Sequence, residues 1–338
     1  MQQATSRSVP TVSLKGPLAS VCPDGVNAQA LPALPVEMKN TSASEPVLPI
    51  VLIHGLLSTP REFGLISLPL QSRGAPLVIL NVPGYTEGDR SQFKRWTTWV
   101  DAACDAIREQ FGAGQPFVLG GLCSGGMVAA AVAARGEFNV RSLVMMSPSF
   151  GYDGWARTRW WGWRKVAHVL GIDRWISVRE SEPYGIKNDK IRKWVARDMH
   201  ARATSAAGPS TLPLWAINQS EQLMRHVARQ FPRLRIPTVV MHSRLDEICS
   251  LGLVKRVFDT LPSGSNRLVV FDNSYHMITI DNDRQQVTAE LLKCSGQGDQ
   301  AQVAAAPLDH AANAPAMNPA HAPAAADAYT GVLLCPTP

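Results

Sequence analysis

A cysteine between two glycines is the best-placed nucleophile in this sequence. Residues 121–126 read Gly-Leu-Cys-Ser-Gly-Gly and follow an apolar run. A nucleophile elbow is a sharp strand-to-helix turn that strains one residue, and glycines two positions to either side let strand and helix approach each other. Cys123 has both, Gly121 and Gly125, whereas Ser124 has a leucine on one side. The spacing favours Cys123 over Ser124 as the nucleophile; a buried structural cysteine in a glycine-rich turn is the alternative.

Two later segments supply an acid and a histidine in the order that such an elbow requires. Residues 238–242 read as a buried strand, and Asp246 lies in the loop that follows its carboxyl end. Residues 268–271 read as the next strand, and His276 lies in the loop after it. The order nucleophile, acid, histidine is therefore satisfied.

At this point the chain resembles the α/β-hydrolase fold, in particular its carboxylesterase and monoacylglycerol-lipase-like branch, also described as serine aminopeptidase-like. The resemblance covers residues 48–293. It rests on four motifs: His54-Gly55 after a strand, the elbow, Arg244-Leu245-Asp246 after a late strand, and the run from His276 to Asp281.

The resemblance implies a triad of Cys123, Asp246 and His276. It also implies an oxyanion hole formed by the backbone N–H groups of Leu56 and Ser124. Glu247 and Asp272 compete with Asp246 for the role of the acid. We favour Asp246 because it follows the strand and matches the Arg-Leu-Asp pattern.

Two residues depart from the pattern of this branch. The branch normally has serine where Cys123 stands, and a small glycine where Tyr275 stands. Cysteine at an elbow resembles instead dienelactone hydrolases, polyester synthases and some cysteine thioesterases or acyltransferases of the same fold. We therefore expect an acyl hydrolase for an ester or thioester that works through an acyl-cysteine intermediate. An acyltransferase or cyclase that moves an acyl chain from a carrier or CoA thioester to an acceptor is the alternative, and a noncatalytic binding protein of this fold is a third.

Continuous apolar runs that alternate with helical periodicity predict an α/β fold with a doubly wound, mostly parallel sheet covered on both faces. Between Trp96 and Phe111, apolar residues recur every three or four positions, which predicts a helix with one face on the sheet. The remaining predicted elements are strands at 50–54, 77–82 and 142–147, a helix from Met127 to Ala134, and a helix that begins near Asp283.

Residues 150–236 form an insertion far longer than an ordinary strand-to-helix connection, and we expect it to be a helical lid. Seven of the nine tryptophans lie there: Trp155, Trp160, Trp161, Trp163, Trp175, Trp194 and Trp215. They are expected either to shape a pocket for an acyl chain or to form the lid's own core. Residues 151–236 carry a net charge of plus nine, against plus six for the whole chain. Such charge either steers an anionic partner such as CoA, a carrier protein or an anionic membrane, or belongs to a solvated helical face.

Composition divides the chain into a flexible segment 1–45, a hydrolase domain 46–294 and a disordered Ala/Pro-rich tail 295–338. No module for nucleic acid is present. No apolar run reaches the roughly 20 residues of a transmembrane helix, so any membrane contact should be peripheral. The first residues lack the apolar stretch of a secretory signal, which predicts a cytoplasmic location. The six cysteines are scattered, and we expect no disulfide framework, no metal and no cofactor.

Overall fold

The computed structural model describes residues 46–86, 94–156, 162–202 and 204–297. The predicted flexible segment 1–45 and residues 298–338 of the predicted tail lie outside the described residues, as do Trp160 and Trp161.

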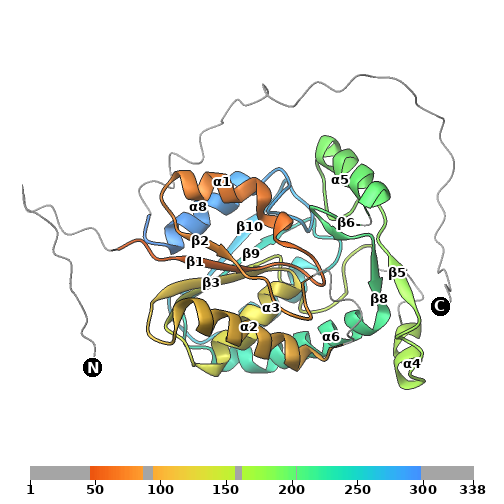
Figure 1. Ribbon diagram of the computed structural model, residues 1–338, viewed down its shortest axis with the longest axis horizontal. Helices are drawn as coiled ribbons and strands as arrows, with labels where there is room; N and C mark the ends of the chain where they lie inside the picture. Colours follow the sequence, from red (N-terminus) through yellow and green to blue (C-terminus); the bar gives the residue numbers. More distant parts are fainter. Residues whose placement is uncertain (1–45, 87–93, 157–161, 203, 298–338) are drawn as a thin grey trace, which may run out of the picture. The chain divides into compact units, whose positions relative to one another are not determined.

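A six-stranded sheet forms the centre of the fold (Figure 1), and every neighbouring pair of its strands is parallel. This result confirms the predicted α/β class with a mostly parallel sheet. The order across the sheet is β10-β9-β4-β3-β1-β2. The strands are β1 (Ile50–Ile53), β2 (Leu77–Ile79), β3 (Phe117–Leu122), β4 (Val140–Met146), β9 (Thr238–Ser243) and β10 (Arg267–Phe271).

Helices cover both faces of the sheet, which explains why its central strands are apolar throughout. Along β1, Val51 and Ile53 pack with one group of helices, whereas Ile50 and Leu52 pack with the other. Side chains of a strand alternate between faces, so four consecutive apolar residues need cover on both sides. The first group comprises α2 (Trp96–Phe111), α3 (Ser124–Arg135), α6 (Leu214–Gln230) and α7 (Leu251–Phe258); the second includes α1 (Gly64–Ser72) and α8 (Arg284–Cys294).

The helix predicted between Trp96 and Phe111 is α2, with these same bounds. It buries Trp99, Val100, Ala103, Cys104 and Ile107. It ends at Gly112, whose φ of 63° lies in the left-handed region where glycine carries no penalty.

The predicted insertion contains two kinds of structure. Its last helix, α6, packs against α2 and α3 and so belongs to the layer beside the sheet. The preceding part contains α4 (Trp163–Val169), α5 (Asp189–Arg202) and two small antiparallel sheets. One sheet pairs β5 (Ser177–Arg179) with β8 (Thr211–Pro213), and the other pairs β6 (Thr204–Ser205) with β7 (Gly208–Pro209). Single 3-10 turns at Pro60–Phe63 and Phe231–Arg233 complete the elements.

The five described tryptophans of the insertion do not fit the first of the two roles expected for them, the wall of an acyl pocket. Trp155, Trp163, Trp175 and Trp194 are all exposed, and Trp215 is half-buried. None of these five lines the cavity at Cys123 described below. Among the described tryptophans, the expectation of an acyl pocket walled by indole rings is therefore wrong. No helix among the described residues is long and apolar enough to cross a bilayer.

Candidate active site

The elbow places Cys123, rather than Ser124, at the strained position. Cys123 lies between the end of β3 and the start of α3, with φ 55° and ψ −121°. Positive φ is uncommon for a residue with a side chain and is found at functional turns. Ser124 is the first residue of α3; it is buried, and its hydroxyl contacts the Ser220 hydroxyl at 2.9 Å. The local backbone thus presents the thiol and buries the neighbouring hydroxyl.

Both elbow glycines sit where no side chain fits. A Cβ atom on Gly121 would lie 2.4 Å from the carbonyl of Gly125. A Cβ on Gly125 would lie 2.2 Å from the carbonyl oxygen of His54, at the end of β1. Glycine is therefore required at both positions because β1, β3 and α3 approach one another closely beneath Cys123.

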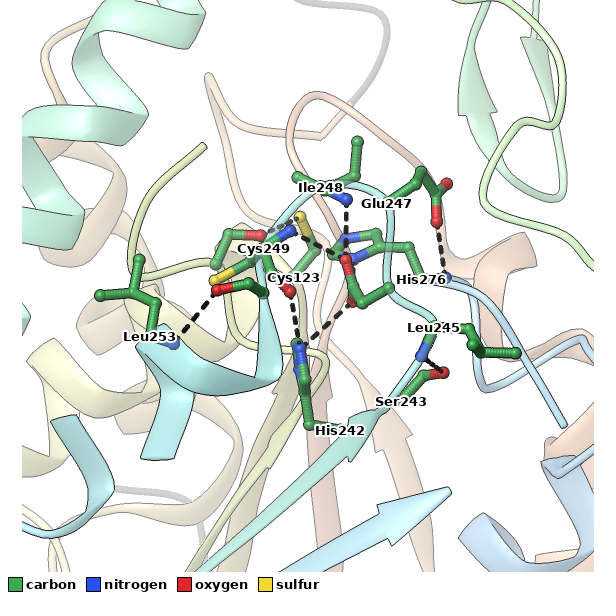
Figure 2. Close-up of polar contacts among 12 residues, drawn as sticks. Cys123, His242, Ser243, Leu245, Glu247, Ile248, Cys249, Leu253 and His276 are labelled. Carbon is green, nitrogen blue, oxygen red and sulfur yellow. Dashed lines mark hydrogen bonds and ion pairs between the residues drawn. The ribbon is translucent and has the colours of Figure 1, made fainter. Parts of the chain in front are cut away.

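Asp246 and His276 form a buried pair at the carboxyl ends of β9 and β10. The Asp246 Oδ2 atom lies 2.7 Å from His276 Nδ1. The Oδ1 atom accepts hydrogen bonds from the backbone N–H groups of Ile248 (2.8 Å) and Cys249 (2.9 Å). Figure 2 shows Cys123 and His276 together with the loop that follows β9. The loop thus uses one carboxylate oxygen to fix its own turn and leaves the other to orient the imidazole.

Burial and charge oppose each other at this pair. Burial disfavours both charged forms, but the attraction between the Asp246 carboxylate and the imidazolium outweighs it. The pKa of Asp246 is therefore lowered, with smaller contributions from His242 and the Cys249 N–H. The pKa of His276 is held well above its ordinary value by Asp246 and by Cys123. His276 is thus suited to accept a proton, and its buried Nε2 atom makes no hydrogen bond of ordinary geometry to a described residue.

The two competing acids lie in different surroundings. Asp272 is exposed and pairs with Arg244 at 2.6 Å. Glu247 is buried, and its Oε2 atom accepts the backbone N–H of His276 at 3.1 Å. Neither of these carboxyls contacts the imidazole ring as Asp246 does. Glu247 instead holds the backbone of the residue that Asp246 orients.

The loop that carries His276 is also tied to the insertion. Asp281 accepts the backbone N–H groups of Tyr275 (2.9 Å), Lys187 (2.7 Å) and Asn188 (2.9 Å). The Met277 N–H donates to the Gly185 carbonyl at 2.8 Å. One carboxylate therefore joins the residues before α5 to the loop after β10.

A cavity opens beside Cys123, and every predicted site residue except Gly121, Gly125 and Asp246 lines it. Its wall includes Cys123, Ser124, Leu56 and His276. As the first helical residue, Ser124 has a backbone N–H with no acceptor in its own helix. The structure thus brings both predicted oxyanion donors, Leu56 and Ser124, to the cavity that holds the thiol.

Three carboxyls lie on the cavity wall, and two of them, Glu62 and Glu180, were not singled out from the sequence. Glu62, Glu180 and Glu247 all line it. Burial raises the pKa of Glu62 and of Glu247 to about 7, and raises that of Glu180 as well. Glu62 accepts the Gly55 N–H at 2.6 Å, just before Leu56. In the sequence Glu62 reads as a polar residue after a loop, and no local signal marks it as buried.

Comparison with known proteins places the chain in a family. Residues 44–283 match the family model described as Serine aminopeptidase, S33. No curated protein sequence matches the chain.

Solved structures show the same fold. A monoacylglycerol lipase from Paleococcus ferrophilus is 17% identical, with a TM-score of 0.61 over 75% of this chain and 97% of that one. A soluble variant of monoglyceride lipase from Saccharomyces cerevisiae is 14% identical, with a TM-score of 0.59 over 78% of this chain and 88% of that one. At these identities the likeness is one of fold.

Proposed function

Because the chain belongs to the Serine aminopeptidase, S33 family of α/β-hydrolases, we propose that it cleaves a carboxylic ester or thioester through an acyl-cysteine intermediate at Cys123. One observation carries this proposal. The residue at the strained elbow is a thiol, and it lines the same cavity as a histidine paired with a buried aspartate. Asp246 orients His276, His276 serves as the base, and Cys123 is the nucleophile.

In the first half of the reaction, the Cys123 sulfur attacks the acyl carbonyl carbon while its proton passes to His276 Nε2. The carbonyl π electrons move to oxygen, and the Leu56 and Ser124 N–H groups hold that oxyanion. When the carbonyl re-forms, the bond to the leaving group breaks, and His276 returns the proton to the departing alcohol or thiol. An acyl-Cys123 thioester remains.

In the second half, a water molecule gives one proton to His276 and its oxygen bonds to the acyl carbon. The carbon–sulfur bond then breaks, and His276 protonates the Cys123 thiolate. The carboxylic acid leaves, and the resting enzyme is restored. An amine, alcohol or thiol in place of water would yield a transferred acyl group by the same steps. The thiol nucleophile favours this second candidate, because thioesters react readily with such acceptors.

We also propose that the described part of residues 150–213, which includes α4, α5 and β5 to β8, acts as the lid over this site; this shortens the expected lid of 150–236, because α6 packs against α2 and α3. Glu180, Pro209 and Leu212 of this segment line the cavity, which supports a covering role. Exposed basic residues of the segment fit the phosphates of a CoA or carrier leaving group, which belongs to the same proposal. A cytoplasmic location belongs to the same proposal; the described cysteines, Cys104, Cys123, Cys249 and Cys294, are free thiols.

The test is to trap the acyl enzyme. Wild type, Cys123→Ala and Ser124→Ala are each incubated with octanoyl-CoA and with 4-nitrophenyl octanoate, and intact masses are measured. We expect an octanoyl adduct on wild type and on Ser124→Ala, and none on Cys123→Ala. An adduct that survives in Cys123→Ala but disappears in Ser124→Ala would instead assign the nucleophile to Ser124.

The decay of the adduct separates hydrolysis from transfer. Decay in buffer alone with release of octanoate supports the hydrolase. Decay only after an amine, alcohol or thiol is added supports the acyltransferase. If neither donor labels any of the three proteins, the site is noncatalytic and the proposal fails.

A further inference from the structure

The helix α4 presents its apolar stripe to solvent. Trp163, Val166 and Val169 recur every third residue and are 50%, 51% and 85% exposed. Leu170 extends the stripe and is 65% exposed. The side of the helix that faces the protein contains Arg164 and Ala167. A surface helix normally has its apolar side inward, so α4 is inverted.

Polar contacts fix α4 in this orientation. The Arg164 guanidinium donates to Asn218 Oδ1 at 3.1 Å and to the Glu221 carboxylate, both on α6. At the other end of the helix, His168 Nδ1 lies 2.5 Å from the buried Asp173 carboxylate. Rotating the apolar stripe inward would break these contacts and expose the buried arginine. The outward stripe is thus a defined surface.

The surroundings of this stripe are basic. Trp175 lies in the chain between the end of α4 and the start of β5, and it is 68% exposed. Lys165, Arg174 and Arg179 are exposed, whereas the one acidic residue between 162 and 179, Asp173, is buried. We call Trp163, Val166, Val169, Leu170 and Trp175 the α4 patch. Tryptophan with aliphatic side chains inside a basic border matches the interface of an anionic bilayer.

We propose that the α4 patch docks the enzyme on an anionic lipid surface. Figure 1 shows α4 at the lower right, apart from the six-stranded sheet and next to the lower end of β5. Strand β5 leads from Trp175 to Glu180, which lines the cavity, and its partner β8 contributes Leu212. A docked protein would therefore hold its cavity near the lipid. This docking does not depend on which residue is the nucleophile.

The test is sedimentation with vesicles of phosphatidylglycerol and of phosphatidylcholine. We expect wild type to bind the anionic vesicles more tightly. Replacing both Val169→Ser and Leu170→Ser should weaken that binding by roughly tenfold or more, since each removes apolar area that enters the interface. Leu68→Ser is the matched control: Leu68 is 74% exposed on α1, outside the patch, and this variant should bind like wild type.

The basic border is tested separately. Lys165→Gln with Arg179→Gln should weaken binding to phosphatidylglycerol by about fivefold per charge and leave binding to phosphatidylcholine nearly unchanged. Thermal unfolding of the variants at Leu68, Lys165, Val169, Leu170 and Arg179 should match wild type, because these side chains are exposed. Cys123→Ala should bind vesicles normally, which keeps this inference separable from the catalytic proposal.

Three results would overturn the docking. The first is wild type that stays in solution with phosphatidylglycerol. The second is a Val169→Ser, Leu170→Ser protein that binds as well as wild type. The third is sedimentation velocity that shows a dimer lost in the same double variant, without vesicle binding. The patch would then be an interface between two copies of the chain.

Discussion

Folded proteins usually bury apolar side chains and expose charged ones. The cavity at Cys123 and the outer face of α4 both depart from this rule, the first by burying carboxyls and the second by exposing apolar side chains. The cavity buries carboxyls, Glu62 and Glu247, whereas α4 exposes valine, leucine and tryptophan. Each departure disfavours folding, because buried carboxyls lose hydration and exposed apolar groups gain no burial. The difference separates two specialised surfaces, a polar cavity lined by residues of several loops and an apolar outer face on one helix of the insertion.

The two surfaces also differ in how strongly their charges act. Inside the cavity, burial shifts the pKa of Glu62 to about 7, so protonation there changes near neutral pH. On the outer face, water and salt screen Lys165 and Arg179, which act together as a diffuse field. Changes in the cavity should therefore affect single reaction steps or stability, and changes on α4 should affect affinity for a surface.

The largest effect should come from removing the thiol. We expect Cys123→Ala to lower kcat/KM for an activated ester on the order of 10⁴-fold or more, because no acyl intermediate can form. Steady-state kinetics with 4-nitrophenyl octanoate measure the effect. Val169→Ser should retain wild-type turnover of a short, water-soluble ester. An equal loss of activity in Cys123→Ala and Val169→Ser would contradict the conclusion that the cavity serves catalysis and the α4 patch does not.

Breaking the orienting carboxylate should have the next largest effect. We expect Asp246→Asn to lower kcat/KM by about 10³- to 10⁴-fold, since the amide no longer stabilises the imidazolium of His276. Asp272→Asn is the matched control, because Asp272 pairs with Arg244 in solvent. If Asp272→Asn is the more damaging change, the acid has been misassigned.

A change in the packing beneath the elbow should lower the free energy of unfolding. Gly125→Ala would place a methyl group 2.2 Å from the His54 carbonyl oxygen, and we expect a loss of about 3 kcal/mol in the free energy of unfolding. Gly114→Ala, with nothing within 4 Å of the added carbon, should change stability little. Urea unfolding of both variants measures the difference; equal midpoints would contradict the close approach of strand and helix.

The smallest effect concerns the pH dependence of stability. The Glu62 pKa rises from 4.5 to about 7 on folding, so the folded protein holds this proton more tightly than the unfolded chain. Its contribution to stability is present below pH 4.5 and is lost as the pH rises through 7. Glu62→Gln should therefore gain about 2 kcal/mol relative to wild type between pH 5 and pH 8.5.

Urea unfolding at the two pH values provides the measurement. Glu109→Gln, on the exposed side of α2, is the control and should follow wild type at both values. A Glu62→Gln protein whose stability relative to wild type is the same at pH 5 and pH 8.5 would mean that the carboxyl titrates normally.

The features that could be predicted from the sequence depend on residues that lie close together along the chain. The spacing of Gly121 and Gly125 around Cys123 reflects contacts within one turn, and the apolar period from Trp96 to Phe111 reflects one helix face. The sheet followed from the alternation of strands and helices. The catalytic roles of Cys123, Asp246 and His276 stay predictions, although the structure brings Asp246 and His276 into contact.

The burial of Glu62 and the orientation of α4 could not be predicted, because both depend on contacts between segments that are distant in the sequence. Glu62 is buried because its 3-10 turn meets Thr279, whose hydroxyl donates to the Glu62 carbonyl across more than two hundred residues. The orientation of α4 is set by Arg164 and its partners on α6, so periodicity alone could not tell which side faces out. The exposure of four tryptophans of the insertion could not be predicted for the same reason.

The Asp281 carboxylate has a mechanical consequence. By accepting the N–H groups of Lys187, Asn188 and Tyr275, it joins the start of α5 to the loop of His276. If the proposed lid moved outward as one body, it would pull the His276 loop away from Cys123. If residues 150–213 form the proposed lid, its opening must use a hinge elsewhere in that segment, because Asp281 keeps the His276 loop joined to Lys187 and Asn188.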